Sequence, residues 1–289
     1  MVIICLLKGG LGNQLFQYSA ACYIQKKFGG YGYIDINSGF ISDSKYKRYF
    51  ALEHFNLNFT KINTFLSIHY LFIYFIRFIK RYTFIGQLLR SMVINDNNIS
   101  NLINSRFCQY KVIILDGYFH SFILAEANHF SLINIHSYYT KFLFDPSIRD
   151  HILKKNSVCL HLRHYSNDTC ISEESIKHFY VQSVAKVLAN VENPFFYVFS
   201  DISNVDLSHL NLPLLQTKII HSDKASHPIS DFYLMSLCKY FIFAGSTFCY
   251  WAVYVSDENK KTVYASSLAL KDKIQVDGLP YYPEHWSII

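Results

Sequence analysis

The sequence predicts an α/β protein of two domains, each built on a parallel β-sheet. Apolar runs alternate with stretches of helical spacing near the start of the chain and again after residue 156, and this alternation is typical of βαβ units. The 289 residues suffice for two domains of about 140 residues each. Hydrophobic residues make up 51% of the chain and charged residues 17%, which excludes a disordered protein.

The first domain, residues 1–152, is expected to open with a strand, a glycine loop, a helix and a second strand. Residues 2–7 form an apolar run before a glycine cluster, and apolar side chains recur at helical spacing from Asn13 to Phe28. Two further runs have the composition of buried strands, at residues 31–36 and 112–118.

The second domain, residues 153–289, follows a helix that opens at Pro146 and a polar break at residues 154–156. Strands and helices are again expected to alternate, which favours a second parallel sheet. The expected strands are 157–162, 195–199, 240–244 and 262–265. The expected helices are 172–189, 231–239 and 247–255.

A basic, aromatic insertion occupies about residues 62–89 of the first domain. Its longest uncharged stretch has 15 residues, from Ile62 to Ile76, and a bilayer span needs about 20. Arg77, Lys80 and Arg81 follow at helical spacing. The insertion is therefore either an amphipathic helix on an anionic membrane surface or a long core helix with a basic rim.

Charge, the N-terminal sequence and the cysteine content predict the kind of partner, the location and the redox state of the protein. Residues 1–150 carry 15 basic and 8 acidic side chains, against 12 and 13 in the remainder, so the first half is expected to face an anionic partner. The opening MVIICLLKGG lacks the pattern of a secretory signal, which predicts a cytoplasmic protein. Seven isolated cysteines, with no CxxC pair, predict buried, reduced thiols rather than a disulfide framework.

The first candidate site is the turn Gly9-Gly10-Leu11-Gly12-Asn13-Gln14, which follows the opening strand. Its glycines allow backbone amides to approach a phosphate or a sugar, and the following helix N-terminus adds positive potential. The amides of Asn13 and Gln14 can donate into a cleft, although a tight turn without a ligand is the alternative. Leu15 stands where the dinucleotide fingerprint needs a third glycine, which disfavours an oxidoreductase.

A second candidate site lies at the end of an apolar strand in the second domain. His161 and Arg163 share one face of that strand, and the ends of parallel strands line the ligand crevice of open α/β sheets. The guanidinium fork suits a diphosphate. A core histidine beside a surface ion pair is the alternative.

Two further strand ends carry polar groups. Ser246 or Thr247 is suited to cap the last helix, whose free backbone amides could then bind a phosphate. The carboxylate of Asp231 is suited to accept hydrogen bonds from the N–H donors of guanine. Ser200-Asp201 follows another strand. A helix cap at Asp231 and a simple turn at Ser200-Asp201 are the alternatives.

Several motifs are missing from the sequence. It contains no P-loop, GxSxG, HExxH or Asp-x-Asp, no histidines at convincing zinc spacing and no RNA-reading motif. We therefore expect no metal and no nucleic-acid partner.

Six segments together resemble glycosyltransferase family 11, the α-1,2-fucosyltransferases, and especially bacterial members that build surface polysaccharides. They occur in the family's order along nearly the whole chain: GGLGNQLFQYSAA, LDGYFHS, HLRHYS, VFSDIS, DFYLMSLCKYFIFAGSTFCYWA and YYPEHW.

The resemblance implies a GT-B-like fold, with two Rossmann-like domains and the donor site in the cleft between them. It also implies an inverting transfer without metal or cofactor from a GDP-6-deoxy-L-sugar. The sugar would be L-fucose, with L-colitose as the close second. The acceptor would be the 2-OH of a galactoside in O-antigen or lipopolysaccharide synthesis. The basic aromatic segment 62–89 would then hold the enzyme at the inner face of the inner membrane, near a lipid-linked acceptor.

The resemblance also implies roles for individual residues. Arg163 would hold the β-phosphate and Asn13 would lie near the transferred sugar, which makes these two the expected catalytic residues. The expected donor-binding set is Gly10, Gly12, Asn13, Gln14, His161, Arg163, Ser200, Asp201, Asp231, Ser246, Thr247 and Phe248. The expected acceptor-binding set is Tyr118, His120 and His164.

The chain departs from the family pattern near the sugar. His164 stands in place of an arginine, Gly245 in place of an asparagine, and Ser166 and Ile202 in place of aspartates. The catalytic base is therefore open among Asp116, Asp168, Glu173 and Asp201. A pocket with fewer polar partners suits a sugar with fewer hydroxyls. A non-catalytic binder of nucleotide sugars or glycans is the alternative from another class.

Overall fold

The structure is a computed structural model. It describes residues 1–41, 43–44, 46–62, 93–106, 108, 110–126, 146–162, 172–200, 205–220, 228–256, 261–268, 270, 276 and 278–289. By its internal contacts the chain divides into two compact units. The first comprises Met1–Phe130 and Ile274–Tyr282, and the second comprises Ser131–Lys273 and Pro283–Ile289. The expected insertion at 62–89 lies outside the described residues except for Ile62.

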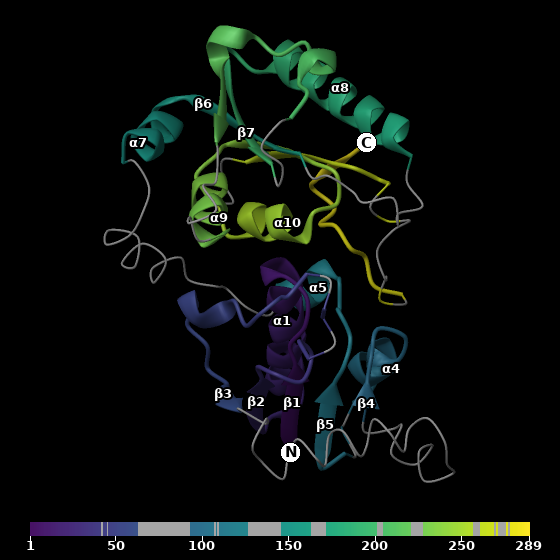
Figure 1. The fold of residues 1–289 in the computed structure, drawn as a ribbon. Coiled ribbons are helices and arrows are strands. Elements are labelled where there is room, and N and C mark those ends of the chain that lie inside the picture. Colours follow the sequence, from purple (N-terminus) through teal and green to yellow (C-terminus); the bar gives the residue numbers. More distant parts are fainter. Residues whose placement is uncertain are drawn as a thin grey trace. The chain divides into compact units, whose positions relative to one another are not determined.

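A five-stranded parallel sheet forms the centre of the first unit, in the order β3-β2-β1-β5-β4 (Figure 1). Its strands are β1 (Val2–Leu6), β2 (Tyr31–Asp35), β3 (Thr60–Ile62), β4 (Val93–Ile94) and β5 (Val112–Leu115). Its helices are α1 (Leu11–Phe28), α4 (Ile99–Asn104) and α5 (Phe122–Ala125), with a 3₁₀ turn η1 (Leu52–His54). The order of strands reverses between β1 and β5, and such a reversal opens a crevice at the carboxyl ends of the strands.

The helix α1 follows β1 after a short glycine turn. It ends at Gly29, whose φ of 73° is costly for any residue with a side chain. Apolar and polar residues alike are buried along it, including Phe16, Gln14 and Gln17. A helix buried on all sides, with polar side chains inside, requires specific hydrogen-bond partners for them.

A six-stranded parallel sheet forms the centre of the second unit, in the order β8-β7-β6-β9-β10-β11. Its strands are β6 (Asn156–Leu162), β7 (Pro194–Ser200), β8 (Thr217–Ile220), β9 (Tyr240–Phe243), β10 (Thr262–Ala265) and β11 (Ser287–Ile288). Its helices are α7 (Pro146–Lys154), α8 (Glu173–Asn190), α9 (Pro228–Ser236) and α10 (Thr247–Tyr254), with 3₁₀ turns η3 (Ser208–Leu210) and η4 (Leu214–Gln216). Counted within the unit, this is the 3-2-1-4-5-6 order of dinucleotide-binding folds, and its reversal lies between β6 and β9.

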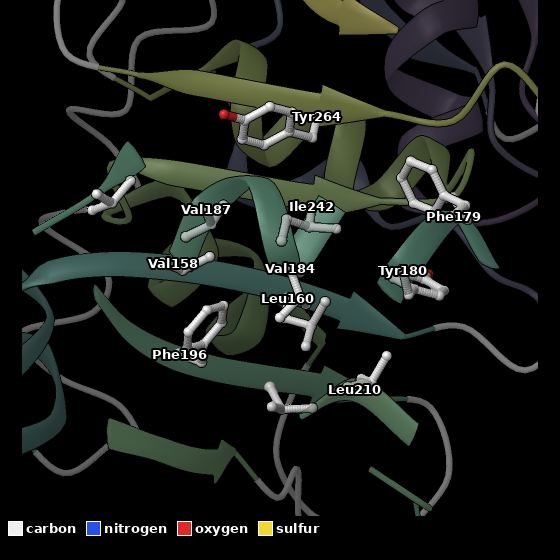
Figure 2. Close-up of a cluster of buried hydrophobic side chains, with 13 residues drawn as sticks. Val158, Leu160, Phe179, Tyr180, Val184, Val187, Phe196, Leu210, Ile242 and Tyr264 are labelled. Carbon is white, nitrogen blue, oxygen red and sulfur yellow. The ribbon is translucent and has the colours of Figure 1, made fainter. Parts of the chain in front are cut away.

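One apolar core lies between this second sheet and α8. Alternate residues of the central strands point into it, as strand geometry requires. They meet one face of α8, which contributes Val184 and Val187 (Figure 2). The buried members of this core are Val158, Leu160, Phe179, Tyr180, Val184, Val187, Val191, Phe196, Val198, Leu210, Ile242, Ala244 and Tyr264.

The strand residues of opposite parity face α10 and the C-terminal segment. The ring of Phe243 meets Trp286 edge to face at 5.9 Å, and Trp286 lies 4.9 Å from Tyr250 of α10. Both faces of the central strands are therefore covered, which is the usual environment of a parallel sheet.

The division between the units differs from the boundary expected after residue 152. His151 of α7 bonds through Nδ1 to the hydroxyl of Tyr197 at 2.6 Å, and its ring packs edge to face on Phe195 at 4.6 Å. Because these contacts dock α7 on β7, the helix belongs to the second unit. Conversely, the amide of Phe122 donates to the carbonyl of Pro280 at 3.1 Å, which ties a late segment to the first unit.

The long elements lie where the sequence predicts them, within three residues at each end. The sequence did not predict the short strands β3, β4, β8 and β11. All six described cysteines are reduced thiols, and five of them are buried, as expected. Within the described part of the chain, no helix is long and apolar enough to cross a membrane.

Candidate active site

In the second unit the expected donor-binding residues gather where the strand order reverses. His161 is the penultimate residue of β6 and is paired with Phe243, the last residue of β9. Ser200 ends β7 opposite Leu162. The carboxyl ends of β7, β6 and β9 therefore lie side by side, and polar residues end or follow each of them.

Ser246 caps α10. The sequence predicts that either Ser246 or Thr247 caps this helix. Gly245 has a φ of 77°, and this turn directs the chain from β9 into the helix. The hydroxyl of Ser246 accepts a hydrogen bond from the amide of Cys249 at 3.4 Å. The first-turn amides of Thr247 and Phe248 have no carbonyl partner within the helix, so they are suited to bind an anion.

Aromatic contacts join His161 to the start of two helices. Its ring lies 6.4 Å from that of Phe248, tilted by 34°, and Phe248 meets Phe232 edge to face at 5.5 Å. The hydroxyl of Tyr180 donates to the carbonyl of His161 at 2.7 Å. Asp231 precedes Phe232 in the first turn of α9 and is partly exposed. The structure thus brings His161, Phe248 and the first turn of α9 together.

Four of the expected site residues lie outside the described residues: Arg163, His164, Asp168 and Asp201. Arg163 follows directly on the last residue of β6, and Asp201 on the last residue of β7. Glu173, a candidate base, is exposed in the first turn of α8.

In the first unit the glycine turn is tied to a distant segment by Gln14. This buried side chain donates from Nε2 to the carbonyls of Gly9 at 2.9 Å and Tyr49 at 2.8 Å, and its Oε1 accepts from the amide of Ala51 at 2.8 Å. Both hydrogens of Nε2 and the oxygen Oε1 therefore form hydrogen bonds within the protein. Gln14 thus joins the glycine turn to the segment at Tyr49–Ala51, and its contact with the donor stays a prediction.

The tie brings Arg48 to the glycine turn. A Cβ added at Gly10 would lie 3.1 Å from Nη1 of Arg48, so the guanidinium occupies the space that the missing side chain leaves. Gly12 is buried in the first turn of α1.

The loop after β5 supplies the partners of Asn13. Nε2 of His120 lies 3.1 Å from Oδ1 of Asn13, and His120 stacks on Tyr118 at 5.4 Å with an interplanar angle of 19°. Nζ of Lys8 forms an ion pair with Asp116 at 3.0 Å and lies 5.0 Å from the ring centre of Tyr118. One expected catalytic residue and two expected acceptor residues thus meet at the reversal between β1 and β5.

Asp96 holds this loop in place. Its buried carboxylate accepts hydrogen bonds from the amides of Tyr118 and Phe119, the latter at 2.5 Å. A Cβ at Gly117 would lie 2.8 Å from Oδ2 of Asp96, and Phe119 has a φ of 55°. The loop is therefore a strained turn that one carboxylate stabilises.

Sequence reasoning did not find Asp96, Lys8 or Arg48. The only signal for Asp96 was an Asn-Asp-Asn-Asn run of turn formers. Among the described residues no group of three or more His, Cys, Asp and Glu is suited to hold a metal ion. The metal-free reaction stays a prediction.

Solved structures of similar fold include fucosyltransferases. The crystal structure of fucosyltransferase NodZ from Bradyrhizobium matches with a TM-score of 0.52 and 15% identity, over 88% of this chain and 92% of that one. FUT1 of Arabidopsis thaliana, in complex with GDP, matches with a TM-score of 0.50 and 10% identity, over 90% of this chain and 71% of that one. The protein therefore has the GT-B-like fold that its sequence predicts.

The family follows from the sequence match. The model of Glycosyl transferase family 11 covers residues 2–286, and the chain belongs to this family. It is 25% identical to the O-antigen biosynthesis glycosyltransferase WbnK of Escherichia coli, over 89% of this chain and 91% of that protein. It is 27% identical to an alpha-1,2-colitosyltransferase of Escherichia coli, over 99% of this chain and 98% of that protein. The resemblance inferred from six segments is confirmed.

Proposed function

We propose that this glycosyltransferase moves a 6-deoxy-L-sugar from its GDP conjugate to the 2-OH of a galactoside during O-antigen synthesis. L-Fucose is the first candidate sugar and L-colitose the second. The name of WbnK supports the O-antigen context, and the name of the alpha-1,2-colitosyltransferase supports colitose as a candidate sugar. Crystals of the α-1,6-fucosyltransferase NodZ were soaked with GDP-fucose or co-crystallized with GDP, which supports a GDP-sugar donor. A lipid-linked acceptor and membrane contact through residues 62–89 remain part of this proposal.

The observation that carries the proposal is the reversal of strand order between β6 and β9. His161 is the penultimate residue of one of these strands, and the capped turn at Ser246 follows the other. This combination suits a nucleoside diphosphate, because aromatic and polar side chains can bind the nucleoside while helix amides bind the phosphates.

The proposed chemistry is a single displacement at C1 of the deoxy-sugar. The acceptor hydroxyl oxygen forms a bond to C1 from the face opposite GDP, the bond from C1 to the phosphate oxygen breaks, and GDP leaves with the electron pair. The proton of the acceptor hydroxyl passes to a base or to water. Negative charge grows on the departing phosphate, where Arg163 and the amides at the start of α10 stabilise it.

A panel of donors tests the proposal. At about 100 times Kd, a donor stabilises the protein by about 2.7 kcal/mol, a rise in Tm of roughly 5–10 °C. We expect GDP, GDP-fucose and GDP-colitose to raise Tm and UDP to leave it unchanged. Mass spectrometry with a β-galactoside acceptor should then detect transfer from one of the two GDP-sugars. Binding without any transfer would instead identify a non-catalytic binder, and an equal response to UDP would refute the choice of nucleotide.

Removal of divalent metals is expected to leave turnover unchanged. If Arg163 and helix amides neutralise the pyrophosphate, no cation is needed for the departure of GDP. The measurement is kcat in excess EDTA, with and without added Mn²⁺. Complete loss of activity that Mn²⁺ restores would contradict the metal-free reaction.

A further inference from the structure

The hydrogen bond between Asn13 and His120 joins the first turn of α1 to the loop after β5, across 107 residues of sequence. The carboxamide oxygen of asparagine accepts hydrogen bonds and cannot donate them. Nε2 of His120, which lies 3.1 Å from Oδ1 of Asn13, must therefore carry a hydrogen. This bond determines both the tautomer of the imidazole and the orientation of the carboxamide.

The other end of the Asn13 carboxamide lies against the glycine turn. A Cβ added at Gly9 would lie 2.7 Å from Nδ2 of Asn13, so this glycine makes room for the amide nitrogen. Asn13 is partly exposed. Among the residues that the structure describes, none accepts a hydrogen bond from Nδ2, and its two hydrogens are available to a ligand.

The ring of His120 is held on several sides and cannot reorient freely. It stacks on Tyr118, and Phe16 and Tyr281 meet it edge to face at 5.1 and 5.9 Å. Only 4% of the residue is exposed. Asp96 holds the backbone of the same loop through two amides. The imidazole is thus a rigid donor, and its position is set before any substrate binds.

We propose that His120 is a positioning residue that orients the Asn13 carboxamide, so that Nδ2 donates to an oxygen of the sugar substrate. The sugar part of this inference rests on the proposed function. The NH₂ group of Asn13 donates hydrogen bonds, so its partner must be a hydrogen-bond acceptor such as a sugar hydroxyl, the ring oxygen or the glycosidic oxygen. This group cannot take a proton from the acceptor hydroxyl, so Asn13 is a binding and orienting group rather than the catalytic base.

Enzyme kinetics test the coupling between the two residues. His120→Leu should lower kcat about 10-fold, because a reacting group held in the wrong orientation reduces the rate. His120→Gln should retain most of the activity, since Nε2 of glutamine can occupy the place of the imidazole Nε2. In an Asn13→Ala background, His120→Leu should add little further loss. The matched control is His178→Gln, an exposed histidine of α8, which should leave kcat unchanged. Additive losses, or equal losses for His120→Leu and His120→Gln, would overturn the proposal.

A second measurement needs no substrate. ¹⁵N spectra of the imidazoles, with His120 assigned by its absence in His120→Gln, report which ring nitrogen carries the proton. We expect Nε2–H in the wild type and a redistribution toward Nδ1–H in Asn13→Leu. A wild-type Nδ1–H tautomer would refute the positioning role even if sugar transfer is confirmed. Failure to find sugar transfer, with the expected tautomer in place, would instead count against the proposed function alone.

Discussion

Replacing Arg163 with alanine is expected to lower kcat by about 100-fold or more, the effect of removing one donor that stabilises charge in the transition state. The residue follows directly on His161-Leu162 at the end of β6. We propose that the diphosphate binds at the strand reversal between β6 and β9, and β6 ends one residue before Arg163. KM for the donor should rise less than kcat falls, since the charge develops as GDP departs.

Two controls accompany this variant. Arg163→Lys keeps the charge but loses the bidentate fork, and should give an intermediate kcat. Arg106→Ala removes an exposed arginine elsewhere in the chain and should leave kcat unchanged. A turnover of Arg163→Ala close to the wild type would remove this residue from the mechanism.

Replacing Phe196 with alanine is expected to lower the free energy of unfolding by about 3–5 kcal/mol. Its ring is fully buried in β7 within the core that α8 covers (Figure 2). Truncation removes apolar contacts and leaves a cavity that the rigid sheet cannot fill. Urea denaturation followed by circular dichroism would measure the change.

The control for Phe196 is Leu214→Ala. Leu214 is 89% exposed, and such surface changes usually alter stability by no more than about 0.5 kcal/mol. Phe196→Leu should lower the free energy of unfolding by an amount between those of Phe196→Ala and Leu214→Ala, because it leaves a smaller cavity. Equal stability of Phe196→Ala and Leu214→Ala would contradict the assignment of this core.

The sequence predicted the long elements because their patterns are local. Helical spacing along α1 and apolar runs such as β6 and β7 are visible in windows of 7 to 18 residues. The strands β4 and β11 have two residues each, which is too short for any periodicity. They form because a neighbouring strand offers an unpaired edge, and that is a property of the fold rather than of the segment.

The sequence indicates candidate site residues where polar groups lie at or after the end of a strand, as at Asn13, His161 and Ser246. Sequence reasoning misses contacts in which a side chain acts on a distant backbone. Asp96 accepts hydrogen bonds from amides 22 and 23 residues later. Gln14 was named from the sequence, but its hydrogen bonds to residues 35 and 37 positions away were not predicted. Such partners depend on tertiary structure alone. A buried polar side chain therefore cannot be told from a ligand-binding one by its type and spacing.

The last residues of the chain contribute to both units, so the two units cannot be separated by cutting the chain once. Residues 274–282 belong to the first unit, while β11 extends the second sheet. A fragment cut after residue 130 would lack Pro280 and Tyr281, which support the loop that carries His120. Independent expression of either half thus requires grafting or circular permutation, not a single cut.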